Sequence, residues 1–264
     1  MALSDFKTIK FERSGRVITA TFNQPDKLNT FTGLSHTELS LVWDELARDE
    51  DSDIIVVTGA GRAFSAGGEI QPMQDLRENP AKFFGVIREA KRIVSSILDC
   101  DKPIVAKVNG DAIGLGATVA MFCDITIANE TARIADPHNN VGLIAGDGGS
   151  VIWPQLIGYA RARHYLLTGA RLNGREAADI GLIYQAVAAD ELDAAVDAYV
   201  KTLSSLPAQS LRWTKATYTI PLKQLAISMM DAGMAYEGLA SRTDDHGEAI
   251  EAFSAKRKPQ FGKR

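Results

Sequence analysis

Two glycine-rich segments, each placed directly after an apolar run, are well suited to hold a charged oxygen. Residues 59–70 follow the β-branched run 54–58, and residues 110–118 follow the largely apolar run 102–109. Glycine lets main-chain N–H groups approach a ligand closely, because no Cβ stands between them. Two strands that each end in such a segment can direct two N–H groups at one oxygen, which is the arrangement of an oxyanion hole.

His138 and Asp147 are the side chains best suited to proton transfer. His138 follows Pro137 in a polar loop, and Asp147 lies nine residues later between glycines. An aspartate that holds one imidazole nitrogen fixes the tautomer and leaves the other nitrogen free to take a proton from water. Both residues also have simpler interpretations. A histidine in a loop is often structural, and Asp147 can cap the helix expected to begin near Ser150.

Dinucleotide binding is the first alternative for the glycine segments. Residues 59–64 begin like the Gly-x-Gly-x-x-Gly fingerprint, but Phe64 occupies the position of the third glycine. The second segment has Val119 at the same position. Because the third glycine allows close packing of the helix on the strand, we do not expect a Rossmann site.

Other kinds of chemistry find little support in the sequence. Ser65 and Ser150 lie outside any nucleophile-elbow context, which argues against a serine hydrolase. No cluster of histidines, cysteines or carboxylates has metal-ligand spacing, so no metal site is expected. His36, His164 and His246 fall on helical patterns, where we expect packing or surface roles.

The composition is that of an ordinary globular protein. Of 264 residues, 45% are hydrophobic and 23% charged, and the net charge of −4 gives no reason to expect nucleic acid as a partner. Cys100 and Cys123 cannot form a disulfide framework. The first residues lack the apolar core of a signal peptide, and the longest apolar stretch, 115–123, is too short to cross a bilayer. We expect a cytoplasmic protein without a membrane partner.

The pattern of apolar residues predicts an α/β chain followed by a helical region. Residues 8–22 alternate about a Ser-Gly turn and predict a hairpin. Further strands are predicted at 54–58, 103–108, 124–128, 133–135 and 184–187, and helices at 32–48, 80–98, 115–122, 151–156, 161–167 and 174–180. The chain reads as helical almost to its end after residue 190, and Thr243 is the expected N-cap of the last helix.

Several motifs in this order resemble the crotonase (enoyl-CoA hydratase/isomerase) superfamily. They are NQPDKLN at 23–29, AFSAGGEI at 63–70, KPIVAKVNGDAIGLG at 102–116, CD at 123–124, LTG at 167–169 and KRKP at 256–259. The resemblance implies a crotonase-like (ClpP/crotonase) spiral of ββα units. It divides the chain into a core, 1–204, that binds acyl-CoA and carries catalysis, and a helical region, 205–264, for self-association as a trimer or a dimer of trimers.

The resemblance also implies acyl-CoA thioesters as substrates, with coenzyme A entering as part of the substrate and no separate cofactor. The oxyanion hole would consist of the N–H groups of Ala66 and Leu115, the latter at the positive end of a helix. The residues implied in binding coenzyme A and substrate are Lys27, Leu28, Ala63, Ala66, Gly67, Gly68, Glu69, Ile70 and Gly114.

The chain departs from the family pattern at both hydratase glutamates, which fall at Thr118 and His138. A threonine hydroxyl is no useful acid or base near neutral pH. The pair of His138 and Asp147 resembles the His/Asp arrangement of crotonase-fold hydrolases that cleave carbon–carbon bonds in β-diketones. We therefore expect either water addition to a CoA thioester or its hydrolytic C–C cleavage. The alternative is a non-catalytic homologue that only binds acyl-CoA.

Overall fold

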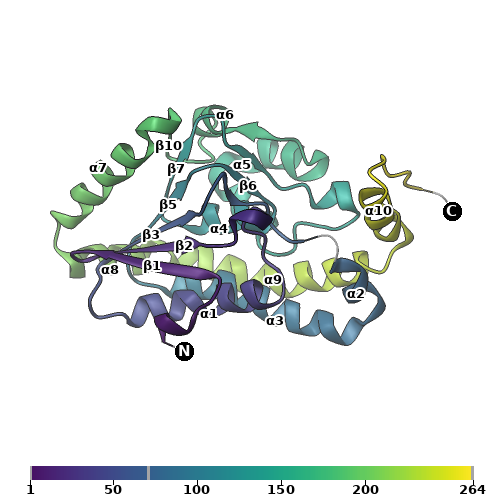
Figure 1. Cartoon of the computed structure of the whole chain (residues 1–264), viewed down its shortest axis with the longest axis horizontal. Helices are drawn as coiled ribbons and strands as arrows, with labels where there is room; N and C mark the ends of the chain where they lie inside the picture. The colour runs from purple at the N-terminus through teal and green to yellow at the C-terminus, as the bar shows by residue number, and fades with distance from the viewer. Residues whose placement is uncertain (1, 70–71, 263–264) are drawn as a thin grey trace.

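The computed structural model describes residues 2–69 and 72–262 and shows a mixed α/β fold (Figure 1). Its main sheet has six strands in the order β1-β2-β3-β5-β7-β10. These strands are β1 (Ile9–Ser14), β2 (Val17–Phe22), β3 (Ile54–Gly59), β5 (Ile104–Val108), β7 (Ile125–Asn129) and β10 (Gln185–Val187). The β1–β2 hairpin is antiparallel, and the strands from β2 to β10 pair in parallel. The predicted hairpin and central strands are confirmed.

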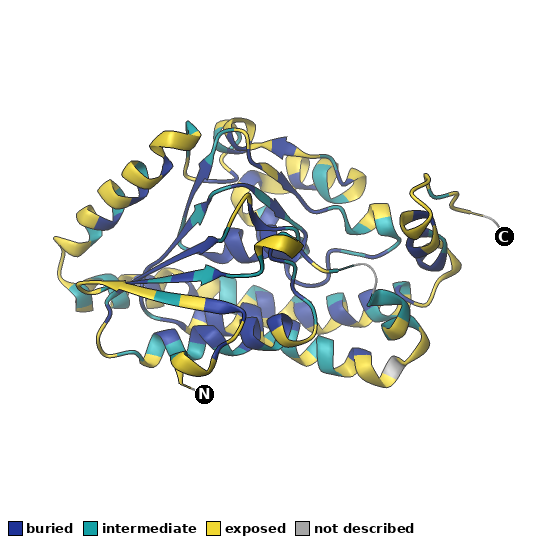
Figure 2. Cartoon of the chain, viewed as in Figure 1, coloured by how far each residue is buried: buried dark blue, intermediate teal, exposed yellow. Residues whose placement is uncertain are grey.

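The central strands are apolar along their whole length because both faces of the sheet are covered. Within β3, Ile55 and Val57 belong to the large core that includes Trp43 of helix α1, whereas Ile54 and Val56 pack in a smaller core with helix α7. Each fully buried side chain of this kind contributes about 1.5–3 kcal/mol. Figure 2 shows the buried strands at the centre and the exposed outer faces of the surrounding helices.

A second, four-stranded sheet forms where the glycine-rich segments were interpreted as loops. It consists of β4 (Ala63–Ser65), β6 (Asp111–Ile113), β8 (Arg133–Ala135) and β9 (Leu172–Asn173), in that order. Strands β4 and β6 pair in parallel. Gly110 allows this approach, since a Cβ at that position would lie 2.1 Å from the Arg62 carbonyl oxygen. Interpreting both segments entirely as loops was wrong, because their glycines are typical of loops. The strand predicted at 133–135 is confirmed as β8.

The helices cover the two sheets and extend beyond them. They are α1 (Leu34–Arg48), α2 (Met73–Glu78), α3 (Pro80–Asp99), α4 (Leu115–Phe122), α5 (Gly149–Thr168), α6 (Gly174–Asp179), α7 (Leu192–Ser204), α8 (Ala208–Tyr218), α9 (Ile220–Ala240) and α10 (Asp244–Ser254). Short 3₁₀ turns lie at Leu3–Asp5, Pro25–Lys27, His138–Val141 and Ala189–Glu191.

Most predicted helices are confirmed, with one difference. The helices expected at 151–156 and 161–167 are both present within α5, whose backbone leaves helical geometry at Gly158, between them. Helix α2 was not predicted. At the start of α10 the hydroxyl of Thr243 accepts a hydrogen bond from the His246 N–H at 3.3 Å, so the predicted N-cap is confirmed.

The C-terminal helices pack against the sheet-containing core. Figure 1 shows α9 running along α3, and α10 beside α2. Helix α8 is anchored by Lys215, which is 3% exposed, lies 2.7 Å from an oxygen of Asp124 and donates to the Lys102 carbonyl oxygen at 2.9 Å. The buried Lys215 charge would carry a large desolvation cost without Asp124 and the Lys102 carbonyl oxygen as partners. Among the described helices, none has the length and apolar character needed to cross a membrane.

Candidate active site

A cavity of about 590 Å³ lies among helices α1, α2 and α3, the start of α4, the loops that carry His138 and Asp147, and the C-terminal helices α9 and α10. Its apolar wall includes Phe31, Leu76, Phe83, Val86, Leu143 and Met234. Its polar side chains include His138 and Asp147. An apolar cavity with a few converging polar groups is the usual form of a small-molecule site.

The N-terminus of α4 opens into this cavity through Leu115. Leu115 is the first residue of the helix, so its N–H has no intrahelical acceptor and lies at the positive end of the helix dipole. Gly67 approaches the same point, because a Cβ there would lie 2.4 Å from the Ile113 carbonyl oxygen and 3.5 Å from the Leu115 nitrogen. The two glycine-rich segments therefore meet at the start of α4.

Ala66 does not supply the second N–H that the resemblance implied. Its N–H donates to the Leu28 carbonyl oxygen at 2.9 Å, and Ala66 is absent from the cavity wall among the described residues. Gly68 does line the cavity, and its N–H has no acceptor within residues 2–69 and 72–262. Phe31 and Gly68 form an isolated parallel β-bridge, in which the Phe31 N–H donates to the Gly67 carbonyl oxygen. This pairing leaves the Gly68 N–H without an acceptor among the described residues.

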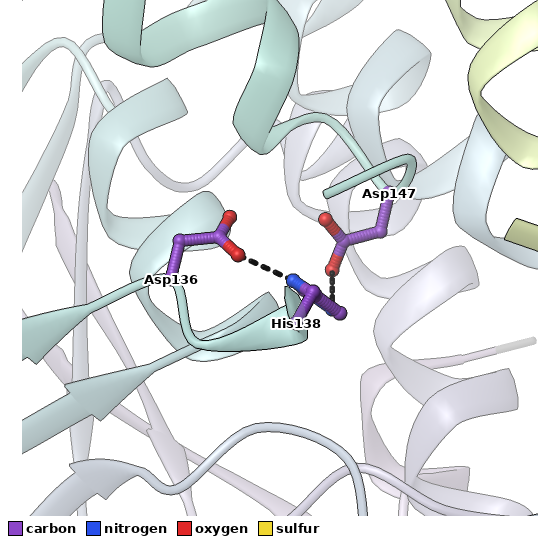
Figure 3. A group of neighbouring side chains, drawn as sticks. All are labelled: Asp136, His138 and Asp147. Atoms are coloured by element: carbon purple, nitrogen blue, oxygen red, sulfur yellow. Dashed lines mark hydrogen bonds and ion pairs between the residues drawn. The ribbon is translucent and has the colours of Figure 1, made fainter. Parts of the chain in front are cut away.

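His138 lies between two aspartates, as Figure 3 shows. Its Nδ1 contacts Asp136, which directly follows strand β8, and its Nε2 lies 3.7 Å from Oδ2 of Asp147. The Nε2 edge faces the start of α4, since a Cβ on Gly114 would be 3.9 Å from it. His138 and Asp147 are thus brought together, but the closer partner of the imidazole is Asp136.

Asp136 is held in place by the tight turn at the start of α5. The side chain is 1% exposed, and its Oδ2 has no hydrogen-bond partner among the described residues. A Cβ on Gly149 would come within 2.0 Å of that oxygen, so only glycine leaves room for the carboxylate. The carboxylate therefore lies against the N-terminus of α5, where the helix dipole favours a negative charge.

Asp147 occupies the other side of the imidazole. Its Oδ1 accepts from the Thr118 hydroxyl at 3.4 Å and from the Gly149 N–H at 3.5 Å, both long contacts. Burial raises the pKa of Asp147, and the positive charge of His138 offsets this only in part. Thr118 is fully buried and contributes this one contact at the position of the first hydratase glutamate.

The charges around His138 favour its protonated form. Burial alone would lower the pKa of the imidazole, but the negative charges of Asp136 and Asp147 outweigh it and hold the pKa well above its ordinary value. A carboxylate on each side therefore makes His138 a proton donor as well as a potential base.

Four residues of this site were missed or misplaced in the sequence analysis. Asp136 lies two residues before His138, and this spacing was the one signal that could have found it. Glu237 on α9 lines the cavity from a part of the chain with no local motif. His36 and His246, expected to pack or to lie on the surface, are 8% and 1% exposed and both line the cavity.

The remaining predicted binding residues surround the glycine-rich segment. Glu69 lines the cavity and pairs with the exposed Lys27 at 3.8 Å. Leu28, Ala63, Gly67 and Gly114 are not among the described residues that line the cavity, and Ile70 falls outside the described residues. Their contact with coenzyme A stays a prediction.

One ligand atom from each of Asp136, His138 and Asp147 lies within 4.8 Å of the others, close enough to hold a metal ion. The direct contact between Asp136 and His138 leaves no room for an ion between those two atoms, because each metal–ligand bond is about 2 Å long. The expectation that this chain needs no metal stays a prediction.

Comparison with known proteins agrees with this geometry. The family model for enoyl-CoA hydratase/isomerase matches residues 12–264. This chain belongs to the enoyl-CoA hydratase/isomerase family. The chain is 33% identical to a probable enoyl-CoA hydratase of Mycobacterium bovis over 97% of this chain and 98% of that protein. It is 32% identical to the 1,2-epoxyphenylacetyl-CoA isomerase of Escherichia coli K12 over 93% of this chain and 94% of that protein.

The fold agrees with membership of this family. A crystal structure of an enoyl-CoA hydratase/isomerase from Mycobacterium paratuberculosis superposes with a TM-score of 0.89 at 34% identity, covering 94% of this chain and 99% of that chain. The predicted crotonase-like fold is thereby confirmed, including a helical C-terminal region. The division at residue 204 and the self-association of the C-terminal helices stay predictions. The C-terminal helices do contribute Met234, Glu237 and His246 to the cavity wall.

Proposed function

We propose that this protein is an enzyme that acts on an acyl-CoA thioester, using His138 to transfer a proton to or from water. The observation that carries the proposal is the position of His138. It lies between two carboxylates, in the wall of the same cavity as the unpaired N–H of Leu115. The names of relatives support the substrate class, since they include enoyl-CoA hydratases and an isomerase of a CoA ester.

The thioester carbonyl would accept hydrogen bonds from the N–H groups of Leu115 and Gly68. Both residues line the cavity, and neither N–H has an acceptor among the described residues. Donors that are already fixed in place stabilise the negative charge of an enolate or a tetrahedral oxyanion without reorganisation, which is typically the largest single contribution to catalysis.

Asp136 would orient the imidazole and Asp147 would help to hold the water. With Nδ1–H donating to Asp136, neutral His138 has its lone pair on Nε2. Nε2 and Asp147 Oδ2 are 3.7 Å apart, so a water on the cavity side of both atoms could donate one hydrogen to each. This assignment gives Asp136 the orienting role that the sequence analysis gave to Asp147.

Two reactions use this arrangement. In the first, the water oxygen adds to the β-carbon of a 2-enoyl-CoA, His138 takes one water proton, and the enolate then takes a proton at the α-carbon. In the second, the hydroxide adds to the β-carbonyl of a β-dicarbonyl CoA ester, the bond between the α- and β-carbons breaks, and the enolate leaves. Thr118 in place of a glutamate favours the second, because only one of the two hydratase carboxylate positions holds an ionisable side chain.

Turnover separates an enzyme from a homologue that only binds acyl-CoA. Straight-chain 2-enoyl-CoA and 3-oxoacyl-CoA esters of increasing length would be incubated with wild type and with His138→Ala, and products identified by mass spectrometry. We expect conversion by wild type and a loss on the order of 10²–10⁴ in rate for the variant. Calorimetric binding of a saturated acyl-CoA to both proteins, with no conversion of any ester, would instead support the binding homologue.

A further inference from the structure

We propose that Glu237, on the C-terminal helix α9, is a catalytic acid of the same centre and gives its proton to the enolate carbon of the substrate. The proposal rests on the function proposed above and assigns the second half of that reaction. His138 and Asp147 account for the removal of a proton from water, but the enolate must also be protonated.

Glu237 reaches the cavity from the side opposite the glycine-rich segments. It lines the same cavity as Leu115, His138 and Asp147, although its helix lies about a hundred residues further along the chain. Gly146 makes this possible, because a Cβ at that position would lie 2.7 Å from Glu237 Oε2. The loop that carries Asp147 is therefore packed directly against the Glu237 carboxyl group.

The carboxyl group is buried, and one of its oxygens lacks a hydrogen-bond partner among the described residues. Glu237 is 8% exposed, and the oxygen without a partner is Oε2. The backbone N–H of Gly146 favours the ionised form, but burial outweighs it. An ionised carboxylate buried in this way is costly unless it is fully paired or hydrogen-bonded, so the neutral acid is the form that this position favours.

Burial, supported by two nearby aspartates, favours the neutral form of Glu237. The groups that face it are His138 and Asp136 beside strand β8, Asp147 before α5, and His246 of α10 across the cavity. Burial raises the pKa of Glu237 to about 8, and the positive charge of His138 only partly opposes this effect. Two aspartates already compensate the imidazolium, so a third negative charge has no counterpart.

With Glu237 as the acid, the source and destination of each proton in the reaction can be named. The reacting form has a neutral His138, so the water gives one proton to Nε2 as its oxygen bonds to the β-carbon. With a 2-enoyl ester this addition forms the enolate directly, and with a β-dicarbonyl ester the bond between the α- and β-carbons then breaks and releases the enolate. The Glu237 O–H gives its proton to the α-carbon as the C–H bond forms, leaving a carboxylate. The extra proton on His138 returns to Glu237 through solvent or through Asp147, which restores both groups for the next turnover.

The test compares Glu237→Gln with a control variant, Asp231→Asn. Asp231 lies on the same helix, and its exposed carboxylate pairs with Lys91. The first variant keeps the shape of the side chain and removes the acidic proton. We expect its kcat to fall on the order of 10²–10⁴-fold while its affinity for a saturated acyl-CoA stays unchanged. The control variant should keep the kcat of wild type. In wild type kcat should fall as the pH rises through about 8, and Glu237→Gln should lose that limb.

A second measurement uses only the wild-type protein, so it does not depend on whether a variant folds. In protein labelled with ¹³C at glutamate side-chain carboxyls, one resonance should titrate near pH 8, far above the others, and should shift when a saturated acyl-CoA binds. If all glutamate carboxyls titrate below pH 6, or if active Glu237→Gln keeps the wild-type kcat, the inference is wrong and the proposed function stands. If wild type converts no ester and exchanges no α-proton of a bound acyl-CoA with D₂O, the proposed function fails.

Discussion

His138 depends on two aspartates that do different work, and the structure separates them by distance. Asp136 contacts Nδ1 directly, whereas Asp147 lies 3.7 Å from Nε2, too far for a direct hydrogen bond. In the proposed function, Asp136 therefore fixes the ring and Asp147 is available to the reacting molecule. Sequence spacing alone cannot assign these roles, because both aspartates are close to the histidine along the chain.

Asp136→Asn should impair catalysis more than Asp147→Asn. The asparagine removes the charge that favours the imidazolium, so the pKa of His138 should fall, and the amide can present either its oxygen or its NH₂ group to Nδ1. Loss of the correct tautomer should lower kcat on the order of 10²–10⁴-fold. The pKa of His138, followed by the NMR shifts of its ring protons, provides the second readout. A larger effect for Asp147→Asn, with the pKa of His138 unchanged in Asp136→Asn, would return the orienting role to Asp147.

The buried cluster should also make stability depend on pH. His138 and Glu237 both have raised pKa values, so the folded protein binds these protons more tightly than the unfolded chain does. Their contribution to the free energy of unfolding is greatest at low pH and is lost as the pH rises toward the raised values. For Glu237 the window lies between about 4.5 and about 8.

Calorimetric Tm values between pH 5.5 and 8.5 measure this contribution. The free energy of unfolding of wild type should fall faster with pH than that of Glu237→Gln, by less than about 1.4 kcal/mol per pH unit, the limit for one proton. Parallel pH profiles for the two proteins would show that Glu237 is ionised in the folded state across this range.

At the scale of elements, two helix N-termini and one pair of short strands build the site. Helix α4 supplies the N–H of Leu115, and the turn before α5 places Asp147 and shields Asp136. Glycine at 149 is essential to this arrangement, because its Cα lies directly beside the Asp136 carboxylate. The site is thus defined by how closely these backbone segments approach one another.

Gly149→Ala should therefore disturb the site by displacing Asp136. The added Cβ would meet Asp136 Oδ2 at 2.0 Å, so the carboxylate must move away from His138 or the start of α5 must shift. We expect a large loss of kcat and a destabilisation of about 1–3 kcal/mol, as for overpacked cores. Ser150→Ala, at the next and half-buried position, serves as the control in the same activity and thermal assays. If Gly149→Ala has the kcat of wild type, the tight placement of Asp136 is not required.

The sequence predicts most elements of this fold and misses the short strands within the glycine-rich segments. The run 54–58 identifies β3 because it is apolar throughout and bounded by polar residues. Strands β4 and β6 have three residues each, and their glycine-rich surroundings resemble loops. The motifs single out His138, Asp147 and Leu115, which the fold brings to one cavity, and their catalytic roles stay predictions. Ala66 was wrong as a donor, because the acceptor of its N–H is a backbone carbonyl that only the folded loop brings near.

At the scale of the whole molecule, the C-terminal helices belong to the catalytic cavity and also present apolar surface. Glu237 could not be predicted, since no local pattern shows which face of α9 meets a loop ninety residues earlier. The same helices expose Trp213, Ile227 and Leu239, which are 68%, 78% and 64% exposed. Large apolar side chains exposed on these helices are candidates for contacts with another chain.

We expect these helices to mediate self-association as a trimer or a dimer of trimers. Light scattering coupled to size exclusion should give a multiple of the 28.5 kDa chain mass at micromolar concentration. Ile227→Asp should shift the distribution toward monomer, because it places a charge within the apolar surface. A wild-type protein that elutes as a 28.5 kDa monomer would contradict the prediction.

Truncation after Leu206 should abolish activity as well as assembly, since it removes Glu237 and His246 from the cavity.

The most direct test of the central claim is turnover in H₂¹⁸O, followed by mass spectrometry of the product formed from the ester that wild type converts fastest. Water activated by His138 should place one ¹⁸O atom in the product, and His138→Ala should form that product on the order of 10²–10⁴-fold more slowly at unchanged affinity for a saturated acyl-CoA. A product without ¹⁸O, or full turnover by His138→Ala, would contradict the account.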